Sequence, residues 1–169
     1  LLNALRALFE RGVNVGTVMI GPPTKAFNAE WKKLLTDFPK ACLVNLTPSN
    51  LGGYFDYKKI AAFNGCLCYC MVSRSEAYGI SYLESWACSK PVIAADIPAM
   101  REVVRDGIDG FLVEFNNIQA MADKIEFLYT HRDKAGEMGK EGYKKIINKN
   151  TWFNISKELR KFIEEVGEL

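Results

Sequence analysis

Apolar residues recur along this chain with two different periods, and segments of the two kinds alternate. At the start of the chain, Leu1, Leu2, Leu5, Leu8 and Phe9 follow the spacing of one face of a helix. Short continuous apolar runs bounded by Gly, Pro or Asn come between such segments and indicate buried strands. The pattern predicts helices at 1–11, 28–38, 54–63, 80–88, 100–105, 117–130 and 133–148, a last helix after Thr151, and strands at 13–20, 41–46, 66–72, 92–95 and 111–114.

This alternation of strands and helices determines the expected fold class. About five successive strand–helix units joined by short loops predict an α/β fold, a parallel sheet with helices on both faces. Neither a repeat nor an interdomain linker interrupts the pattern, so we expect residues 1–169 to form a single domain. The apolar face of the last helix is expected to point inward; it carries Trp152, Ile155, Leu159, Phe162, Ile163 and Val166.

The candidate chemistry lies in the stretch from Ser73 to Ala95. A polar turn follows the predicted strand 66–72, and Gly79 stands where this loop passes into the next helix. A helix N-terminus presents free N–H groups and a partial positive charge, which suits a phosphate or diphosphate. Glycine has no Cβ, so a ligand can come close to the backbone. Ligands of open parallel sheets bind beyond the carboxyl ends of the strands, where this loop lies.

Two carboxylates bracket this loop and restrict the kind of ligand. Glu76 precedes Gly79, and Glu84 follows one turn into the helix. Beside a phosphate alone they would repel it, whereas they fit if each accepts hydrogen bonds from hydroxyl groups. A ligand with a sugar on one side of its phosphates and a ribose on the other meets this requirement. Arg74 in the preceding turn is a further candidate phosphate contact.

An extended motif surrounds the two carboxylates. Its parts are Glu76-x7-Glu84 with Tyr78-Gly79-Ile80 inside it, Ala87-Cys88-x-Lys90-Pro91-Val92-Ile93, and Arg101-Glu102-Val103-Val104-Arg105-Asp106-Gly107-x2-Gly110-Phe111-Leu112-Val113. This motif resembles the donor-binding signature of retaining GT-B glycosyltransferases, and specifically of family 4, the "group 1" glycosyl transferases. The resemblance implies a Rossmann-like fold that forms the C-terminal half of a GT-B enzyme. It also implies that the chain is a fragment lacking the N-terminal acceptor domain and the first strand of its own domain. By the same resemblance, the helix after Thr151 matches the segment that crosses back to the N-terminal domain, so its apolar face would be partly exposed in this fragment.

The resemblance implies a function and a role for each site residue. The full enzyme would transfer a hexosyl group from a nucleoside diphosphate sugar to an acceptor, with retention of configuration, and this fragment alone would be inactive. Glu76 would be the catalytic residue, contacting hydroxyls of the transferred sugar near the developing positive charge, and Glu84 would bind the ribose. Backbone N–H groups for the diphosphate and sugar would come from Tyr78, Gly79, Ile80 and Ser81, of which Ile80 would also pack in the core.

Two other functions remain open beside this one. One is a nucleotide-sugar epimerase-type GT-B enzyme, and the other is a non-catalytic domain that has lost donor binding. Retaining GT-B glycosyltransferases generally need no metal, so the resemblance implies neither a metal nor a cofactor besides the nucleotide-sugar substrate. The sequence departs from the family pattern at Ser89, where glycine is usual, and this position tests whether the turn requires a positive φ.

Composition and charge exclude several classes of protein. Hydrophobic residues make up 49% and charged residues 25% of the chain, an ordinary globular balance, and the net charge of +2 offers no electrostatic case for nucleic acid. The five cysteines are odd in number and lack the spacing of a disulfide framework, so we expect reduced thiols in a cytoplasmic protein. Cys66, Cys68 and Cys70 share one strand face and are expected in the core rather than on a metal.

The remaining polar features are expected on the surface. His131 is the one histidine, so a Ser-His or Cys-His mechanism has no visible base. The lysines at 140, 144, 145 and 149 are expected to form a solvated helix face. Such a face could contact an anionic membrane leaflet, so the protein could lie peripherally at the inner face of the membrane, with an acceptor that is lipid-linked or a glycan.

Overall fold

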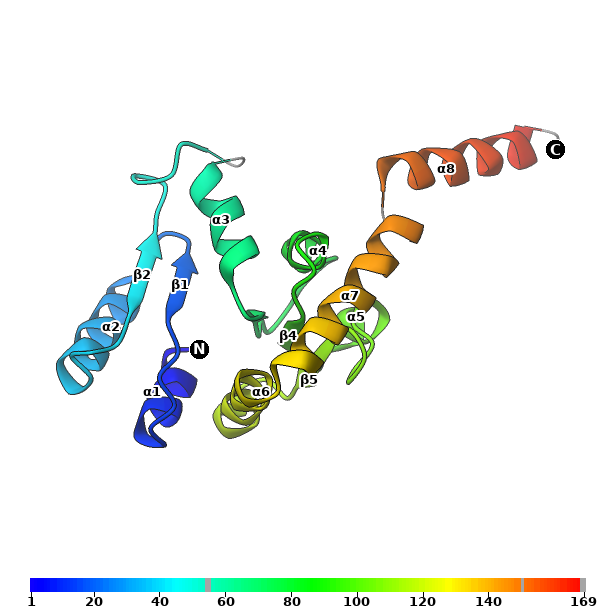
Figure 1. Ribbon diagram of the computed structural model, residues 1–169. Helices are drawn as coiled ribbons and strands as arrows, with labels where there is room; N and C mark the ends of the chain where they lie inside the picture. Colours follow the sequence, from blue (N-terminus) through cyan, green and yellow to red (C-terminus); the bar gives the residue numbers. More distant parts are fainter. Residues whose placement is uncertain (54–55, 150, 168–169) are drawn as a thin grey trace.

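Strands and helices alternate along the chain in the predicted order (Figure 1). The computed structural model describes residues 1–53, 56–149 and 151–167. The elements are α1 (Leu2–Glu10), β1 (Thr17–Ile20), α2 (Lys25–Asp37), β2 (Leu43–Leu46), α3 (Tyr57–Gly65), β3 (Tyr69–Met71), α4 (Ile80–Ala87), β4 (Val92–Ala95), α5 (Pro98–Val103), β5 (Gly110–Val113), α6 (Ile118–Thr130), α7 (Arg132–Lys149) and α8 (Trp152–Gly167).

The strands form two parallel sheets rather than the single sheet that the alternation predicts. β1 pairs with β2, with Thr17 opposite Leu43. β4 lies between β3 and β5, so that Ile93 is opposite both Cys70 and Phe111. Every one of these pairings is parallel, which confirms the α/β class. In the described chain, no strand of the β1–β2 sheet is hydrogen-bonded to a strand of the β3–β4–β5 sheet, so the two sheets stay separate.

Both strands at this break are shorter than predicted. The predicted strand 13–20 contains β1 only in its second half, and 66–72 contains β3 only in its centre. The residues outside the ladders are still partly buried, and Val13, Val15 and Leu67 pack against the hydrophobic core. The apolar pattern therefore reports burial correctly, whereas the length of a ladder also depends on which strand lies alongside.

Two helices begin at capping residues that the periodicity does not show. The Thr24 hydroxyl accepts a hydrogen bond from the Phe27 N–H at 3.1 Å and starts α2 before the predicted residue 28. The Asp56 carboxylate accepts from the Lys58 N–H at 2.7 Å and starts α3 after the predicted residue 54. Residues 54–55 lie outside the described part of the chain.

Strand β4 is buried on both faces and organises the core. Ile93 belongs to the cluster that α1 and α6 complete, whereas Val92 and Ala94 pack with Tyr82 and Trp86 of α4. This division follows from the two-residue alternation of side chains along a strand. Helices therefore cover both faces of the sheet, as the sequence predicts.

Helix α7 packs against α4, and the buried Asp109 bonds to a residue of each helix. The Trp86 Nε1–H donates to the Asp109 carbonyl at 2.7 Å, and the Lys145 Nζ donates to the Asp109 Oδ2 at 2.7 Å. A Cβ at Gly142 would lie 1.9 Å from the Trp86 ring, so the two helices meet at van der Waals distance because this residue is glycine. Lys145 therefore points inward. The prediction that it belongs to a solvated lysine face is wrong for this residue.

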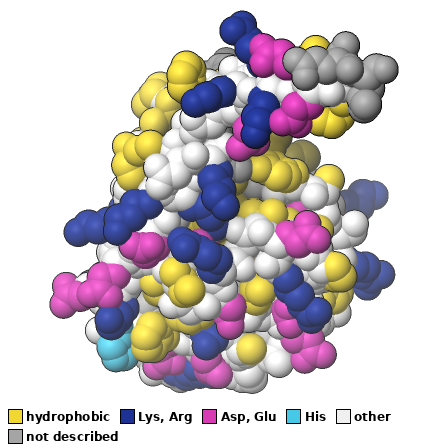
Figure 2. Space-filling model, turned by 90° about the vertical axis from the view of Figure 1, so that its right-hand side faces the viewer, with side chains coloured by type: hydrophobic (Ala, Val, Ile, Leu, Met, Phe, Trp, Pro, Cys, Tyr) yellow, Lys and Arg dark blue, Asp and Glu magenta, His cyan; other side chains and the backbone are white. Residues whose placement is uncertain are grey.

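The last helix does not pack against the body of the molecule. α8 extends beyond the end of α7 (Figure 1), and Trp152 at its start is 87% exposed. Figure 2 shows hydrophobic side chains in the recess beneath α8 and interspersed basic and acidic side chains over the face below it. The periodicity-based prediction that the apolar face of this helix points inward is therefore wrong for the described chain, whereas the exposure of this face that the resemblance implies is confirmed.

The turn between α4 and β4 has a left-handed backbone at Ser89, the position where glycine is usual in the family pattern. Ser89 has φ +56°, a conformation that costs a residue with a Cβ about 1–2 kcal/mol. We expect Ser89→Gly to raise the free energy of unfolding by about 0.5–1 kcal/mol, because relief of this strain exceeds the greater flexibility of unfolded glycine.

Thermal unfolding monitored by circular dichroism would measure this change. Asn116→Gly is the matched control, since Asn116 has a similar φ of +65° but asparagine tolerates it better. A destabilised Ser89→Gly variant would contradict the interpretation of the turn.

Candidate functional site

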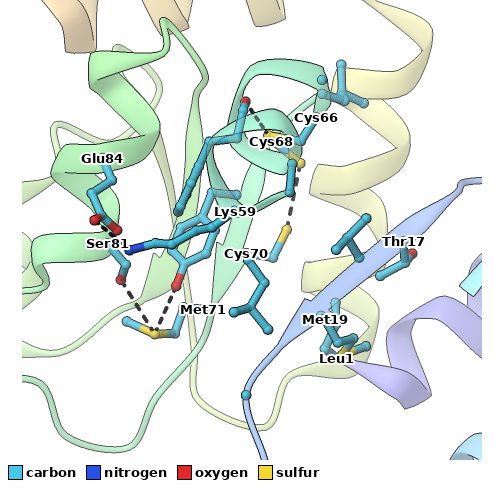
Figure 3. Close-up of a pocket in the computed structure, with 18 of the residues that line it drawn as sticks. Leu1, Thr17, Met19, Lys59, Cys66, Cys68, Cys70, Met71, Ser81 and Glu84 are labelled. Atoms are coloured by element: carbon cyan, nitrogen blue, oxygen red, sulfur yellow. Dashed lines mark hydrogen bonds and ion pairs between the residues drawn. The ribbon is translucent and has the colours of Figure 1, made fainter. Parts of the chain in front are cut away.

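A cleft of about 1410 Å³ lies between the two sheets, and Figure 3 shows its lining side chains. The loop after β3, the first turns of α4, and α3 form one wall, and β1 forms the facing wall. The structure brings almost all of the predicted site residues to this cleft. Those that line it are Glu76, Tyr78, Gly79, Ile80, Ser81 and Glu84.

Gly79 sets the geometry at the start of α4. It is the N-cap residue with φ +75° and ψ +55°, and its helix has no side-chain cap. A Cβ at this position would lie 2.3 Å from the ring of Tyr82, which is itself held by a hydrogen bond from its hydroxyl to the Met71 carbonyl. Glycine is thus required both for the backbone conformation and for space. The uncapped N–H groups of the first turn remain available to an anionic ligand at the cleft.

Glu76 lies next to this helix N-terminus. Its Oε1 accepts a hydrogen bond from the Ala77 N–H at 3.1 Å. Its Cγ would be 3.6 Å from a Cβ at Gly79, so the carboxylate side chain and the start of α4 are immediate neighbours. A negative charge is therefore placed within reach of whatever the helix N-terminus binds.

Glu84 lies one turn further along α4 and pairs with a residue that the sequence analysis missed. The Lys59 Nζ of α3 lies 2.7 Å from the Glu84 Oε1, and the two side chains are 15% and 25% exposed (Figure 3). Partial burial strengthens such a pair relative to one on the open surface. No sequence signal marks Lys59, because it stands among other polar helix residues and meets Glu84 only through the packing of α3 beside α4.

The remaining candidate residues differ in what their side chains do. Ile80 is 61% exposed at the cleft, so the prediction that it also packs in the core is wrong. The left-handed turn at Gly79 leaves this first residue of α4 on the solvent side. The Ser81 hydroxyl lies 3.9 Å from the Met71 sulfur. Arg74 does not line the cleft; its guanidinium lies 5.2 Å from the centre of the Phe115 ring.

The cysteines in and just before β3 line the cleft, and Cys68 and Cys70 are partly buried against the hydrophobic core, as expected. The Cys68 and Cys70 sulfurs are 3.7 Å apart, as expected for residues on one strand face. Burial raises the pKa of the Cys66 thiol to about 12, so this thiol stays protonated and unreactive near neutral pH. Within the described ranges, His, Cys, Asp and Glu form no group of three or more that could hold a metal ion.

Comparison with known proteins identifies the family. The family model described as "Glycosyl transferases group 1" matches residues 1–145. An uncharacterized glycosyltransferase of Methanocaldococcus jannaschii is 34% identical over 125 residues, which cover 73% of this chain and 35% of that protein. The alpha-maltose-1-phosphate synthase of Mycolicibacterium smegmatis is 32% identical over 98 residues, covering 54% of this chain and 25% of that protein.

Solved structures show the same fold. HepE of Anabaena in complex with UDP-glucose superposes with a TM-score of 0.74 at 18% identity. The match includes 100% of this chain and 44% of HepE. The C-terminal domain of a glycosyl transferase group 1 family protein from Francisella tularensis gives a TM-score of 0.70 at 22% identity, over 89% of this chain and 77% of that one. The chain thus spans less than half of the first matching relatives. By its match over residues 1–145 the chain belongs to the group 1 glycosyl transferases, and its fold is that of a GT-B C-terminal domain.

Proposed function

We propose that this chain is the donor domain of a retaining hexosyltransferase and binds a nucleoside diphosphate sugar in the cleft. The observation that carries the proposal is the arrangement of Glu76 and Glu84 on one cleft wall, with the uncapped N-terminus of α4 beside them. The helix terminus suits the diphosphate, and each carboxylate can accept hydrogen bonds from hydroxyls of the sugar or the ribose. The complex of HepE with UDP-glucose supports this choice of ligand.

In the proposed reaction, the bond from the anomeric carbon to the diphosphate breaks and a bond to an acceptor hydroxyl oxygen forms on the same face of the sugar. The acceptor's proton leaves with the nucleoside diphosphate. The N–H groups at Gly79 and Ile80 would stabilise the negative charge of the departing diphosphate, and Glu76 would stabilise positive charge on the sugar. Glu84, oriented by Lys59, would hold the ribose.

The reaction is expected to need no metal ion. The helix N-terminus and basic side chains would balance the charge of the leaving group, a task that Mg²⁺ performs in many other transferases. We therefore expect EDTA to change the transfer rate of the whole protein by less than about twofold, a difference below ~0.5 kcal/mol in the barrier. A loss of activity with EDTA that added Mg²⁺ or Mn²⁺ restores would contradict metal independence.

Lys59 is expected to influence donor affinity through Glu84. We expect Lys59→Met to weaken binding of the nucleotide sugar by roughly 5–10-fold, about 1–1.4 kcal/mol, because it removes a close partner that orients the Glu84 carboxylate. Isothermal titration calorimetry on the whole protein would measure the change.

Lys58→Met provides the matched control for this prediction. The Lys58 Nζ donates to the Asn50 carbonyl at 2.6 Å, and Lys58 does not line the cleft, so its loss should leave the affinity unchanged. Equal effects of the two substitutions would show that Lys59 has no specific role.

The reaction itself is tested by the products of the whole protein, because this chain corresponds to 35% of the Methanocaldococcus relative and the acceptor site would lie elsewhere. We propose an acceptor that is a glycan or lipid-linked, at the cytoplasmic face of a membrane. Among the described helices none is long and apolar enough to cross a bilayer. NMR of the product should show the anomeric configuration of the donor. Inverted configuration, or an epimerised nucleotide sugar without transfer, would overturn the proposal.

A further inference from the structure

Helix α4 carries the candidate donor site at its N-terminus, and buried groups hold its other end. The helix has 8 residues, with Gly79 as its N-cap and Trp86 in its last turn. These two residues lie roughly 10 Å apart along the axis, because a helix rises about 1.5 Å per residue. Such a short helix moves as one body, so the groups that fix Trp86 also determine where the first N–H groups of α4 point.

Trp86 is fully buried and is held from two directions. Its Nε1–H donates to the Asp109 carbonyl at 2.7 Å, and the Lys145 Nζ lies 3.5 Å from the centre of its ring. An ammonium group is attracted to the negative face of an indole, most strongly where water is excluded. The two contacts together fix both the place and the rotation of this side chain.

The Asp109 carboxylate connects these contacts to two further parts of the chain. It is fully buried, and its Oδ2 accepts from the Lys145 Nζ and from the Arg105 Nε, each at 2.7 Å. The Lys145 Nζ also donates to the Val103 carbonyl at the end of α5, at 2.6 Å. Removal of one partner from a buried charge leaves the remaining groups uncompensated. The arrangement around Trp86 therefore depends on the Lys145 ammonium.

Helix α7 lies next to α4 (Figure 1) and comes close because two of its contacting residues are glycine. Gly139, Gly142 and Lys145 are spaced three residues apart and so share one side of α7. A Cβ at Gly139 would overlap the Ser89 carbonyl oxygen, and one at Gly142 would overlap the Trp86 ring. The end of α4 thus rests directly on α7, with Lys145 at one end of the contact.

A second attachment lies in the middle of α4. The Tyr82 side chain is fully buried, and its hydroxyl donates to the Met71 carbonyl. If Trp86 were released, the helix could pivot about Tyr82, and Gly79 on the other side of this pivot would be displaced. Small displacements of binding groups are costly, because a site must hold its ligand to within a fraction of an ångström.

We infer that Lys145 and Asp109 are positioning residues for donor binding: they hold Trp86, and through α4 they direct the N–H groups after Gly79 at the nucleotide sugar. This inference rests on the proposed function of the cleft. Neither Lys145 nor Asp109 lines the cleft, so each acts through α4 and not by contact with the ligand. Loss of their ion pair should therefore lower donor affinity although every side chain that lines the cleft is retained.

Lys145→Met tests the inference in the whole protein labelled with ¹⁵N-glycine, because methionine keeps an apolar stem but lacks the ammonium. We expect the Gly79 amide resonance of the ligand-free protein to shift. We also expect affinity for whichever of UDP-, GDP- and ADP-glucose the native protein binds to fall roughly 3–10-fold, a usual size for substitutions that act through packed neighbours. Calorimetric titration well below the unfolding temperature would measure this affinity.

Met121→Ala is the matched control for a loss of stability alone. Met121 is buried in the core cluster that contains α1 and α6, and it does not line the cleft. This variant should leave the Gly79 resonance and the affinity of the folded protein unchanged. Unchanged affinity or an unchanged Gly79 resonance in folded Lys145→Met, or equal changes in Met121→Ala, would overturn the inference.

Trp86→Phe decides the question if Lys145→Met does not fold. It removes the indole N–H that bonds to the Asp109 carbonyl and keeps an aromatic ring. The same two changes are expected, and their absence would overturn the inference. If the native protein binds none of the three sugars, the proposed function is wrong and the donor role of Lys145 is wrong with it. A Gly79 shift confined to the Lys145 and Trp86 variants would then support only their hold on α4.

Discussion

Glu76→Gln is expected to lower the kcat of the proposed transfer by the whole protein by roughly 10²–10³-fold, the usual effect of removing one electrostatic contact to a transition state. Glutamine keeps the shape of the side chain and an oxygen that can accept the Ala77 N–H. It removes only the negative charge that would stabilise the sugar as positive charge develops on it. The KM for the nucleotide sugar should therefore change much less than kcat.

Initial rates of transfer at several donor concentrations would separate these two quantities. Glu102→Gln is the matched control, because Glu102 is an exposed glutamate of α5 that does not line the cleft. A kcat for Glu76→Gln within about threefold of the native protein, less than ~0.7 kcal/mol in the barrier, would remove Glu76 from the proposed catalytic role.

Gly79→Ala is expected to abolish measurable donor binding and to destabilise the fold by about 2–5 kcal/mol. The left-handed φ of +75° would cost alanine about 1–2 kcal/mol. The new Cβ would in addition lie 2.3 Å from the Tyr82 ring, and overpacking of this kind typically costs about 1–3 kcal/mol. Relief of the contact would move the start of α4, and with it the N–H groups proposed to bind the diphosphate.

Gly107→Ala separates strain from the effect on the site. Gly107 has φ +72° but open space around a Cβ, and it lies outside the cleft lining. We expect it to lose about 1–2 kcal/mol from strain alone and to bind the donor normally. Urea unfolding and calorimetric titration would measure both variants. Normal donor binding by a folded Gly79→Ala protein would contradict the role of this turn.

The parts of the site that depend on local sequence could be predicted. Gly79 and Glu84 belong to one loop and the helix that follows it, so their spacing in sequence already determines that they share one end of α4. The positive φ at Ser89 could also be anticipated, because it depends on a single tight turn. The order and class of the elements followed from apolar periodicity, which reflects burial.

The features that could not be predicted depend on which elements meet in space. The pairing of Lys59 with Glu84 joins residues 25 positions apart, and no periodicity contains that information. The division into two sheets likewise depends on which strands become hydrogen-bonded neighbours, which the apolar runs alone do not show. The apolar stripe of α8 predicts a face that is covered, but amphipathicity does not show what covers it, and in the described chain this face is exposed.

The most direct test of the central claim is an NMR titration of the whole protein, labelled with ¹⁵N-glycine, with UDP-, GDP- and ADP-sugars. We predict that the sugars of one nucleotide shift the Gly79 amide resonance and that Glu84→Ala abolishes this response. Such a result would place the donor at the N-terminus of α4 and identify its base. If no nucleotide sugar shifts the Gly79 amide at millimolar concentration, the chain is not a donor domain and the proposed function is wrong.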